Sequence, residues 1–276
     1  MADKSIFVRT VHADFQIGMK CPFLLAILGV TLGFFFDNWQ DIRLSISASV
    51  ANADSSPICI MYYVFNSLSF GGVFTGYFST IMAAIPFSTN YCWELGDGIS
   101  IYKISRCGQP TYVRSKFLVA ATLGGLTMLL GELVFILILS TYLPIVTQEK
   151  ILESQWIPFF HMLTIGGGAP YLAITLYITL LSGALWGSIG LWISAYFPSS
   201  YVAVCAPFIF RFLLVQIGRL LNLPNGLRLD RLLVARGTIY SDFVTLVVTT
   251  ATVLVLIFLC YRLFMKRMER RIWDVE

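Results

Sequence analysis

Residues 86–116 read PFSTNYCWELGDGISIYKISRCGQPTYVRSK. This polar segment lies between two long apolar stretches, in a chain of which only 12% of the residues are charged. Its charged residues are Glu94, Asp97, Lys103, Arg106, Arg114 and Lys116. A charged insert between two apolar stretches has to meet water, a partner or a substrate. What this segment contacts is therefore the main question that the sequence raises about function.

The rest of the chain is apolar. Hydrophobic residues make up 57% of the 276 positions, and the mean hydropathy is +0.78. Apolar runs of about 18 residues or more are typical of transmembrane helices. The sequence therefore predicts an all-α polytopic membrane protein with a single transmembrane domain over residues 1–276. The six predicted spans are Pro22–Phe36, Ile58–Ile85, Phe117–Tyr142, Tyr171–Ala195, Tyr201–Leu221 and Tyr240–Phe264.

The charge distribution predicts the orientation. Six spans place both termini on the same side of the membrane. With the N-terminus inside, the inner segments hold twelve Lys and Arg residues and the outer segments hold six. The positive-inside rule then favours a multi-pass protein of the cell membrane with both termini cytoplasmic, although four arginines between the last two spans oppose it. Anionic lipid accounts for the net charge of +4, without a nucleic acid partner.

Two further segments are predicted to contact the membrane surface. Residues 1–20 are predicted to form an amphipathic interfacial helix, because Phe7, Val11 and Phe15 recur every four residues while Asp14 falls largely on another face. Residues 219–239 are apolar but carry arginines, with a turn at residues 223–226. We expect an outer helical hairpin there, which dips into the outer leaflet before the last span.

Several kinds of chemistry are missing from the sequence. It has no G-x-x-x-x-G-K-[ST] phosphate loop, no G-x-S-x-G elbow and no H-E-x-x-H zinc pair. The two histidines, His12 and His161, fall on opposite sides of the predicted topology. We therefore expect no catalytic residue, no metal and no cofactor, and a protein that is not itself an enzyme.

Two ionisable residues fall inside predicted spans. Glu132 lies in the third span and Arg211 in the fifth. Charges at this depth usually face the bundle interior and find a partner. One hypothesis is that the two residues are paired or line a polar pathway. The alternative, given equal weight, is that each satisfies a local hydrogen bond or snorkels.

The polar segment is predicted to contain a short cytosolic helix. Residues Ile99–Ile104 suit a compact helix, and Gly108 to Pro110 would break the chain before the next span. Apolar and aromatic side chains disfavour an ordinary solvated loop. These are Tyr91, Trp93, Ile99, Ile101, Tyr102 and Tyr112. A short helix between spans is suited to receive force from a soluble motor.

In this segment the sequence resembles the membrane subunits of type-2 ABC exporters. The residues that carry the resemblance are, in order, Phe87-Ser88-Thr89, Glu94, Gly98, Arg106, Tyr112 and Lys116. The resemblance implies a coupling segment over residues 86–116 that docks a separate ABC ATPase subunit. The implied coupling residues are Glu94, Gly98, Tyr102, Arg106, Tyr112 and Lys116, with a second, smaller contact at Phe197–Ser200.

The same resemblance implies the function. It indicates the permease subunit of an ATP-driven exporter, paired with a second permease chain as a homo- or heterodimer, for an amphiphilic substrate such as a peptide, an antibiotic or a lipid-like molecule. Substitutions Glu94→Ala or Arg106→Glu should then uncouple ATP hydrolysis from transport and leave the fold intact. The alternative is an ATP-independent secondary transporter or channel with six spans, which would need several intramembrane charges and broken helices. An intramembrane hydrolase would need a clustered catalytic set.

Overall fold

The computed structural model describes residues 2–50, 59–69, 72–146, 159, 162, 168–224, 228–233 and 241–273. Every regular element in these ranges is a helix, which confirms the all-α class. The helices are α1 (Ala2–Gly18), α2 (Cys21–Val50), α3 (Ile60–Ser69), η1 (Phe74–Phe78), α4 (Ser79–Gly96), α5 (Ile99–Cys107), α6 (Gln109–Leu139), α9 (Ala169–Ser194), α10 (Ser200–Leu220), α11 (Leu229–Leu232) and α12 (Asp242–Trp273).

Five helices in the described part of the chain are long and apolar enough to cross a membrane. They correspond to the first, third, fourth, fifth and sixth predicted spans. Their candidate membrane segments are Cys21–Ser47, Gln109–Leu139, Ala169–Ser194, Ser200–Leu220 and Asp242–Arg270. The chain is therefore a membrane-spanning helical protein.

The second predicted span is not one continuous helix. Its described part is divided into α3, the π-helical turn η1, and α4, which continues through Pro86 to Gly96. The division has a physical cause in α2, where the Asp37 carboxylate accepts hydrogen bonds from the backbone N–H groups of Phe74 (2.9 Å) and Thr75 (2.7 Å). These are unpaired donors at the start of a new helical segment, so a carboxylate there stabilises the break.

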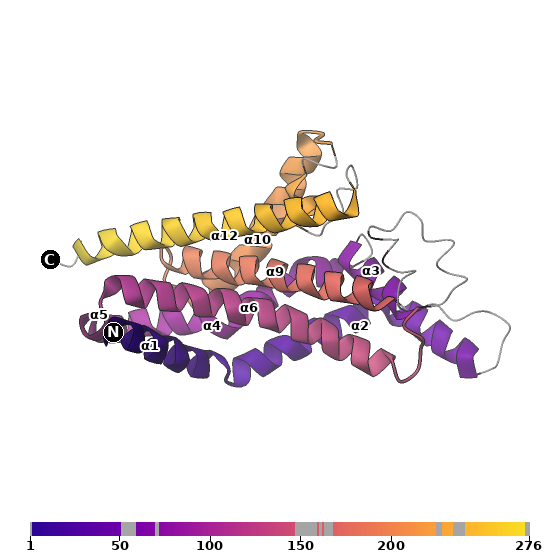
Figure 1. The fold of residues 1–276 in the computed structure, drawn as a ribbon, viewed down its shortest axis with the longest axis horizontal. Helices are drawn as coiled ribbons and strands as arrows, with labels where there is room; N and C mark the ends of the chain where they lie inside the picture. The colour runs from indigo at the N-terminus through magenta and orange to yellow at the C-terminus, as the bar shows by residue number, and fades with distance from the viewer. Residues whose placement is uncertain are drawn as a thin grey trace.

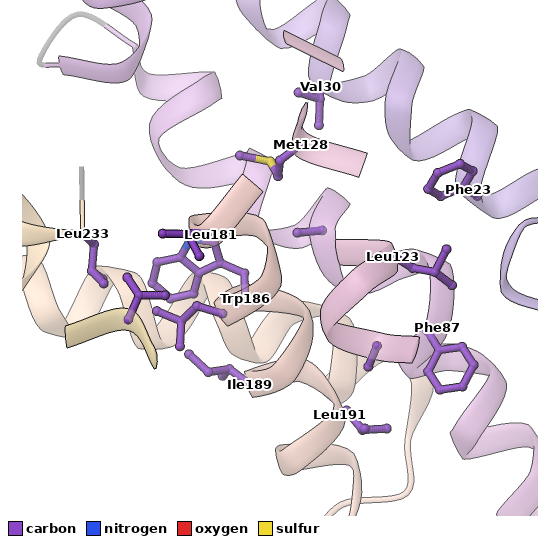
Figure 2. Close-up of a cluster of buried hydrophobic side chains, with 14 of the residues drawn as sticks. Phe23, Val30, Phe87, Leu123, Met128, Leu181, Trp186, Ile189, Leu191 and Leu233 are labelled. Carbon is purple, nitrogen blue, oxygen red and sulfur yellow. The ribbon is translucent and has the colours of Figure 1, made fainter. Parts of the chain in front are cut away.

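Helices α6 and α9 form the centre of the bundle and run antiparallel. Small residues let their backbones approach closely, and a Cβ added at Gly124 would lie only 2.6 Å from the carbonyl oxygen of Gly183. A Cβ at Gly187 would likewise lie 2.6 Å from the carbonyl oxygen of Ala120. Figure 2 shows Trp186 of α9, with Leu181 and Ile189 near it in the same buried cluster.

The N-terminal helix belongs to the bundle. The predicted apolar face of α1 contacts the core through Val11 and Phe15, and Gly18 lies against Leu123 of α6. Asp14 is buried on this inner face, so its predicted position on another face is wrong. Figure 1 shows α5, the start of α1 and the end of α12 at the same end of the bundle. Of the predicted hairpin at 219–239, α11 is a described helix, whereas residues 225–227 and 234–240 lie outside the described residues.

The Asp37 contact gives a first prediction. Replacing Asp37 with Ala should destabilise the protein by about 1–3 kcal/mol, because two N–H groups lose a charged acceptor. The measurement is thermal unfolding of the detergent-solubilised protein. Asp41→Ala is the matched control, since in the described part of the chain only the backbone carbonyl of Asp41 accepts a hydrogen bond. Equal decreases in unfolding temperature for the two variants would contradict a stabilising role of the Asp37 hydrogen bonds.

Candidate functional site: a buried ion cluster beneath helix α5

The polar segment 86–116 is helical over most of its length. Its first part continues α4 to Gly96, and its last part begins α6 at Gln109, so that α5 is the connection between them. The predicted short helix is confirmed and continues to Cys107. Glycine is required at both turns because Gly98 (φ 69°) and Gly108 (φ 77°) have a positive φ, a region that other residues rarely adopt. These two turns fold α5 back onto the end of the bundle.

Four charged side chains meet directly beneath α5. The Lys116 ammonium of α6 is fully buried and lies 2.8 Å from Asp14 Oδ1 of α1 and 2.6 Å from Glu94 Oε1 of α4. Lys103 of α5 lies 2.7 Å from Glu94 Oε1 and 3.4 Å from Asp14 Oδ1. Two carboxylates and two ammonium groups therefore cancel in formal charge. We call these four residues the ion cluster; it joins α1, α4, α5 and α6.

Neutral groups complete the ion cluster. Ser115 Oγ donates a hydrogen bond to Asp14 Oδ2 at 2.7 Å, and the Tyr112 hydroxyl donates one to Glu94 Oε2 at 3.1 Å. All four carboxylate oxygens therefore accept at least one hydrogen bond. The Lys116 ammonium also lies 5.2 Å from the ring centroid of Phe87 and 5.3 Å from that of Tyr112. Such complete pairing is the condition under which charges tolerate burial.

Lys103 is the partly exposed member of the ion cluster. Burial is the largest single influence and lowers the pKa of its ammonium group, but the hydrogen bonds and charges of Glu94 and Asp14 together outweigh burial, so the net pKa is raised. A raised pKa means that the Lys103 ion pairs stabilise the folded state fully at any pH below the pKa of lysine in the unfolded chain, about 10.4. This stabilisation is lost only as the pH rises through the raised value. The Lys103 contacts are therefore constant across the neutral range.

The predicted coupling residues divide into a buried and an exposed group. Glu94, Tyr112 and Lys116 are buried, which removes them from any surface that a soluble partner could touch. Tyr102 (73% exposed) and Arg106 point outward from α5, and Gly98 forms its first turn. Glu94 forms ion pairs with two lysines, so Glu94→Ala is expected to weaken the fold itself. This differs from the intact fold that the resemblance implies for this variant.

An exposed set of large apolar side chains lies on α5 and at the end of α4. Its members are Trp93 (69% exposed), Ile101 (62%) and Tyr102 (73%). Arg106 of α5 and Arg114 near the start of α6 are exposed as well. We call these five residues the α5 face. Large apolar side chains gathered beside arginines are typical of protein-binding surfaces.

The two intramembrane ionisable residues do not pair within the described part of the chain. Glu132 is fully buried, and both of its carboxylate oxygens lack a hydrogen-bond partner there. The guanidinium of Arg211 lies over the rings of Tyr77 (5.9 Å) and Trp186 (5.8 Å). The hypothesis of a Glu132–Arg211 ion pair is therefore not supported.

Asp14 and Lys103 are partners of the coupling residues that were not predicted from the sequence. A signal for Asp14 was present, because Phe7, Val11, Asp14 and Gly18 follow the spacing of one helical face. Nothing local marks Lys103 as a partner of Asp14, since they are far apart in the sequence. Their contact depends on how α1 lies against α6.

Comparisons with known proteins do not add to this geometry. No protein-family model, curated protein or solved structure matches the chain. A function has to be argued from the ion cluster, the α5 face and the membrane helices alone.

The ion cluster gives a second prediction. Replacing Lys116 with Met should destabilise the protein by about 3–5 kcal/mol, because Asp14 and Glu94 are left buried with only Lys103 between them. Unfolding of the purified protein in detergent measures the effect. Lys20→Met, at an exposed lysine just after α1, is the matched control and should change stability by less than about 0.5 kcal/mol. A loss below about 1 kcal/mol for Lys116→Met would mean that the ion cluster does not hold the four helices together.

Proposed function

We propose that this chain is the membrane-spanning permease subunit of an ATP-driven exporter of the type-2 ABC kind. It forms the translocation path, and a separate ABC ATPase subunit hydrolyses ATP. The observation that carries the proposal is the α5 face, an exposed apolar surface fixed directly to a buried ion cluster.

The α5 face suits a soluble protein partner. Trp93, Ile101 and Tyr102 offer large rigid side chains, which dominate the energetics of protein interfaces, and the arginines supply a polar rim. Lys103 joins the same helix to α1 and α4, and Lys116 joins those two helices to α6. A displacement of α5 by the ATPase would therefore move four helices together, as a coupling element requires. The exposed Phe197 in the turn between α9 and α10 supplies the second, smaller contact.

The topology of the proposal has six spans. The second span consists of α3, η1 and α4 together, and the end of the bundle that carries α5 faces the cytoplasm. The basic residues of α12 support this orientation, because they lie toward the end of that helix, which Figure 1 places at the same end of the bundle as α5. They are Arg262, Lys266, Arg267 and Arg270. Both termini are then cytoplasmic in the cell membrane.

The proposal includes a second permease chain and an amphiphilic substrate. Apolar side chains of α10 and α12, such as Phe212 and Phe258, are exposed and suit contact with that second chain or with lipid. An almost wholly apolar groove of about 470 Å³ lies along α10 and the end of α9. Ile193, Tyr201 and Leu213 are among its lining residues. A groove of this kind accommodates an acyl chain or an apolar peptide segment, which supports a peptide, antibiotic or lipid-like cargo.

One observation favours the alternative, an ATP-independent secondary transporter or channel. The helical break at η1, stabilised by Asp37, resembles the discontinuous helices of such proteins. Dependence on an ATPase separates the two functions. The ATP-driven proposal requires one, and the alternative does not.

The α5 face gives a third prediction. The tagged protein, purified from its native membranes, should retain a subunit with a nucleotide-binding phosphate loop, identified by mass spectrometry and by labelling with a photoreactive ATP analogue. Substitution Tyr102→Ala or Arg106→Glu should reduce the amount of that subunit at least about tenfold, since loss of a central aromatic anchor costs about 2 kcal/mol or more and reversal of a rim charge introduces repulsion.

Matched controls lie away from the α5 face. Tyr142→Ala and Arg219→Glu change the same residue types at exposed positions near the far ends of α6 and α10. They should leave the retained subunit unchanged, and all four variants should unfold at the temperature of the wild type. Retention of the ATPase by Tyr102→Ala and Arg106→Glu at the wild-type level, or its absence from the wild type, would contradict the proposal.

A further inference from the structure

Glu132 lies in the contact between α6 and α9, deep within the bundle. It falls two helical turns after Gly125, on the same face of α6. That face meets α9, because a Cβ added at Gly125 would lie 2.9 Å from the carbonyl oxygen of Leu180. Counting from Lys116, Glu132 is about 24 Å further along the helix. The carboxyl group is therefore far from the ion cluster at the end of the bundle.

No charged group in the described part of the chain compensates Glu132. Its two carboxylate oxygens are buried without hydrogen-bond partners, and so is the hydroxyl oxygen of Thr179 on α9. Within the described residues, the Thr179 hydroxyl and the Glu132 carboxyl group therefore do not hydrogen-bond to each other. On the α2 side, the nearby Thr31 hydroxyl already bonds the carbonyl oxygens of Ile27 and Gly131.

An ionised carboxylate in these surroundings would be an isolated buried anion, which proteins avoid by keeping the group neutral. We infer that Glu132 is a proton-binding site, occupied while α6 and α9 are in contact and emptied when they separate. On separation, water reaches the carboxyl group, the O–H bond breaks, and the proton passes to water and leaves a carboxylate. On closure, the carboxylate takes a proton back. The α6–α9 contact thus binds one proton, whatever drives its opening, so the inference does not depend on the proposed ATPase.

Reaction with dicyclohexylcarbodiimide tests the site directly. This hydrophobic reagent adds to protonated carboxyl groups in apolar surroundings, and mass spectrometry of peptides locates the adduct. In reconstituted vesicles at pH 6, the adduct should form on Glu132 and decrease as the pH is raised. The ion-paired Asp14 and Glu94 are internal controls and should stay unmodified. Labelling of those two residues without Glu132, or protection of Glu132 by Na⁺ at constant pH, would overturn the inference.

The variant Glu132→Gln provides a test that does not depend on access of the reagent. Its amide matches the shape of the neutral acid and cannot ionise. In the wild type, the folded state keeps a proton that the unfolded chain releases above about pH 4.3, so the stability of the wild type falls as the pH rises. The unfolding constant of the wild type, relative to Glu132→Gln, should rise about tenfold per pH unit from pH 5 to 7.

Denaturant unfolding in mixed micelles at several pH values measures this ratio. Glu269→Gln, at an exposed position near the end of α12, is the matched control and should show no such trend. If the ratio of the unfolding constants of the wild type and Glu132→Gln stays constant with pH, the inference is overturned, because the folded wild type then holds no additional proton.

Discussion

The buried Lys116 ammonium is the constraint on which the inner end of the structure depends. A lysine at the start of a transmembrane helix cannot be buried alone, so it requires the carboxylates of Asp14 and Glu94. Those two carboxylates come from different helices and carry more negative charge than Lys116 neutralises. Lys103 of α5 supplies the second positive charge. One electrostatic requirement thus fixes α1, α4, α5 and α6 relative to one another.

Two further contacts extend this constraint through the bundle. Helix α4 is held at one end by Glu94 in the ion cluster, while the η1 turn before its other end is held to α2 by Asp37. Beside it, α6 and α9 are in close glycine-mediated contact, with the neutral Glu132 enclosed further along. A force applied to α5 would therefore reach a helix that is fixed at two points and that packs against α6 and α9.

Much of the fold could be predicted from the sequence, because it rests on long apolar runs. The five candidate spans and the helix at α5 follow from length, hydropathy and the glycines around Asp97. The break at η1 could not be predicted, since it depends on Asp37, a residue of another helix. Of the predicted coupling residues, Tyr102 and Arg106 are exposed and can meet a partner, but Glu94 and Lys116 are buried, which the sequence does not indicate. Burial of a charged pair depends on partners far apart in the sequence, and Asp14 is the clearest case.

Hydrogen exchange tests most directly whether the ion cluster joins four helices into one unit. The amides to follow are those of α1, α5 and the ends of α4 and α6 nearest Glu94 and Lys116, in the wild-type protein and in Lys116→Met. If the ion cluster joins them, the amides of all four segments lose protection together in the variant, while the amides around Gly124 in the α6–α9 contact stay protected. Loss of protection confined to α5, or none at all, would contradict the account.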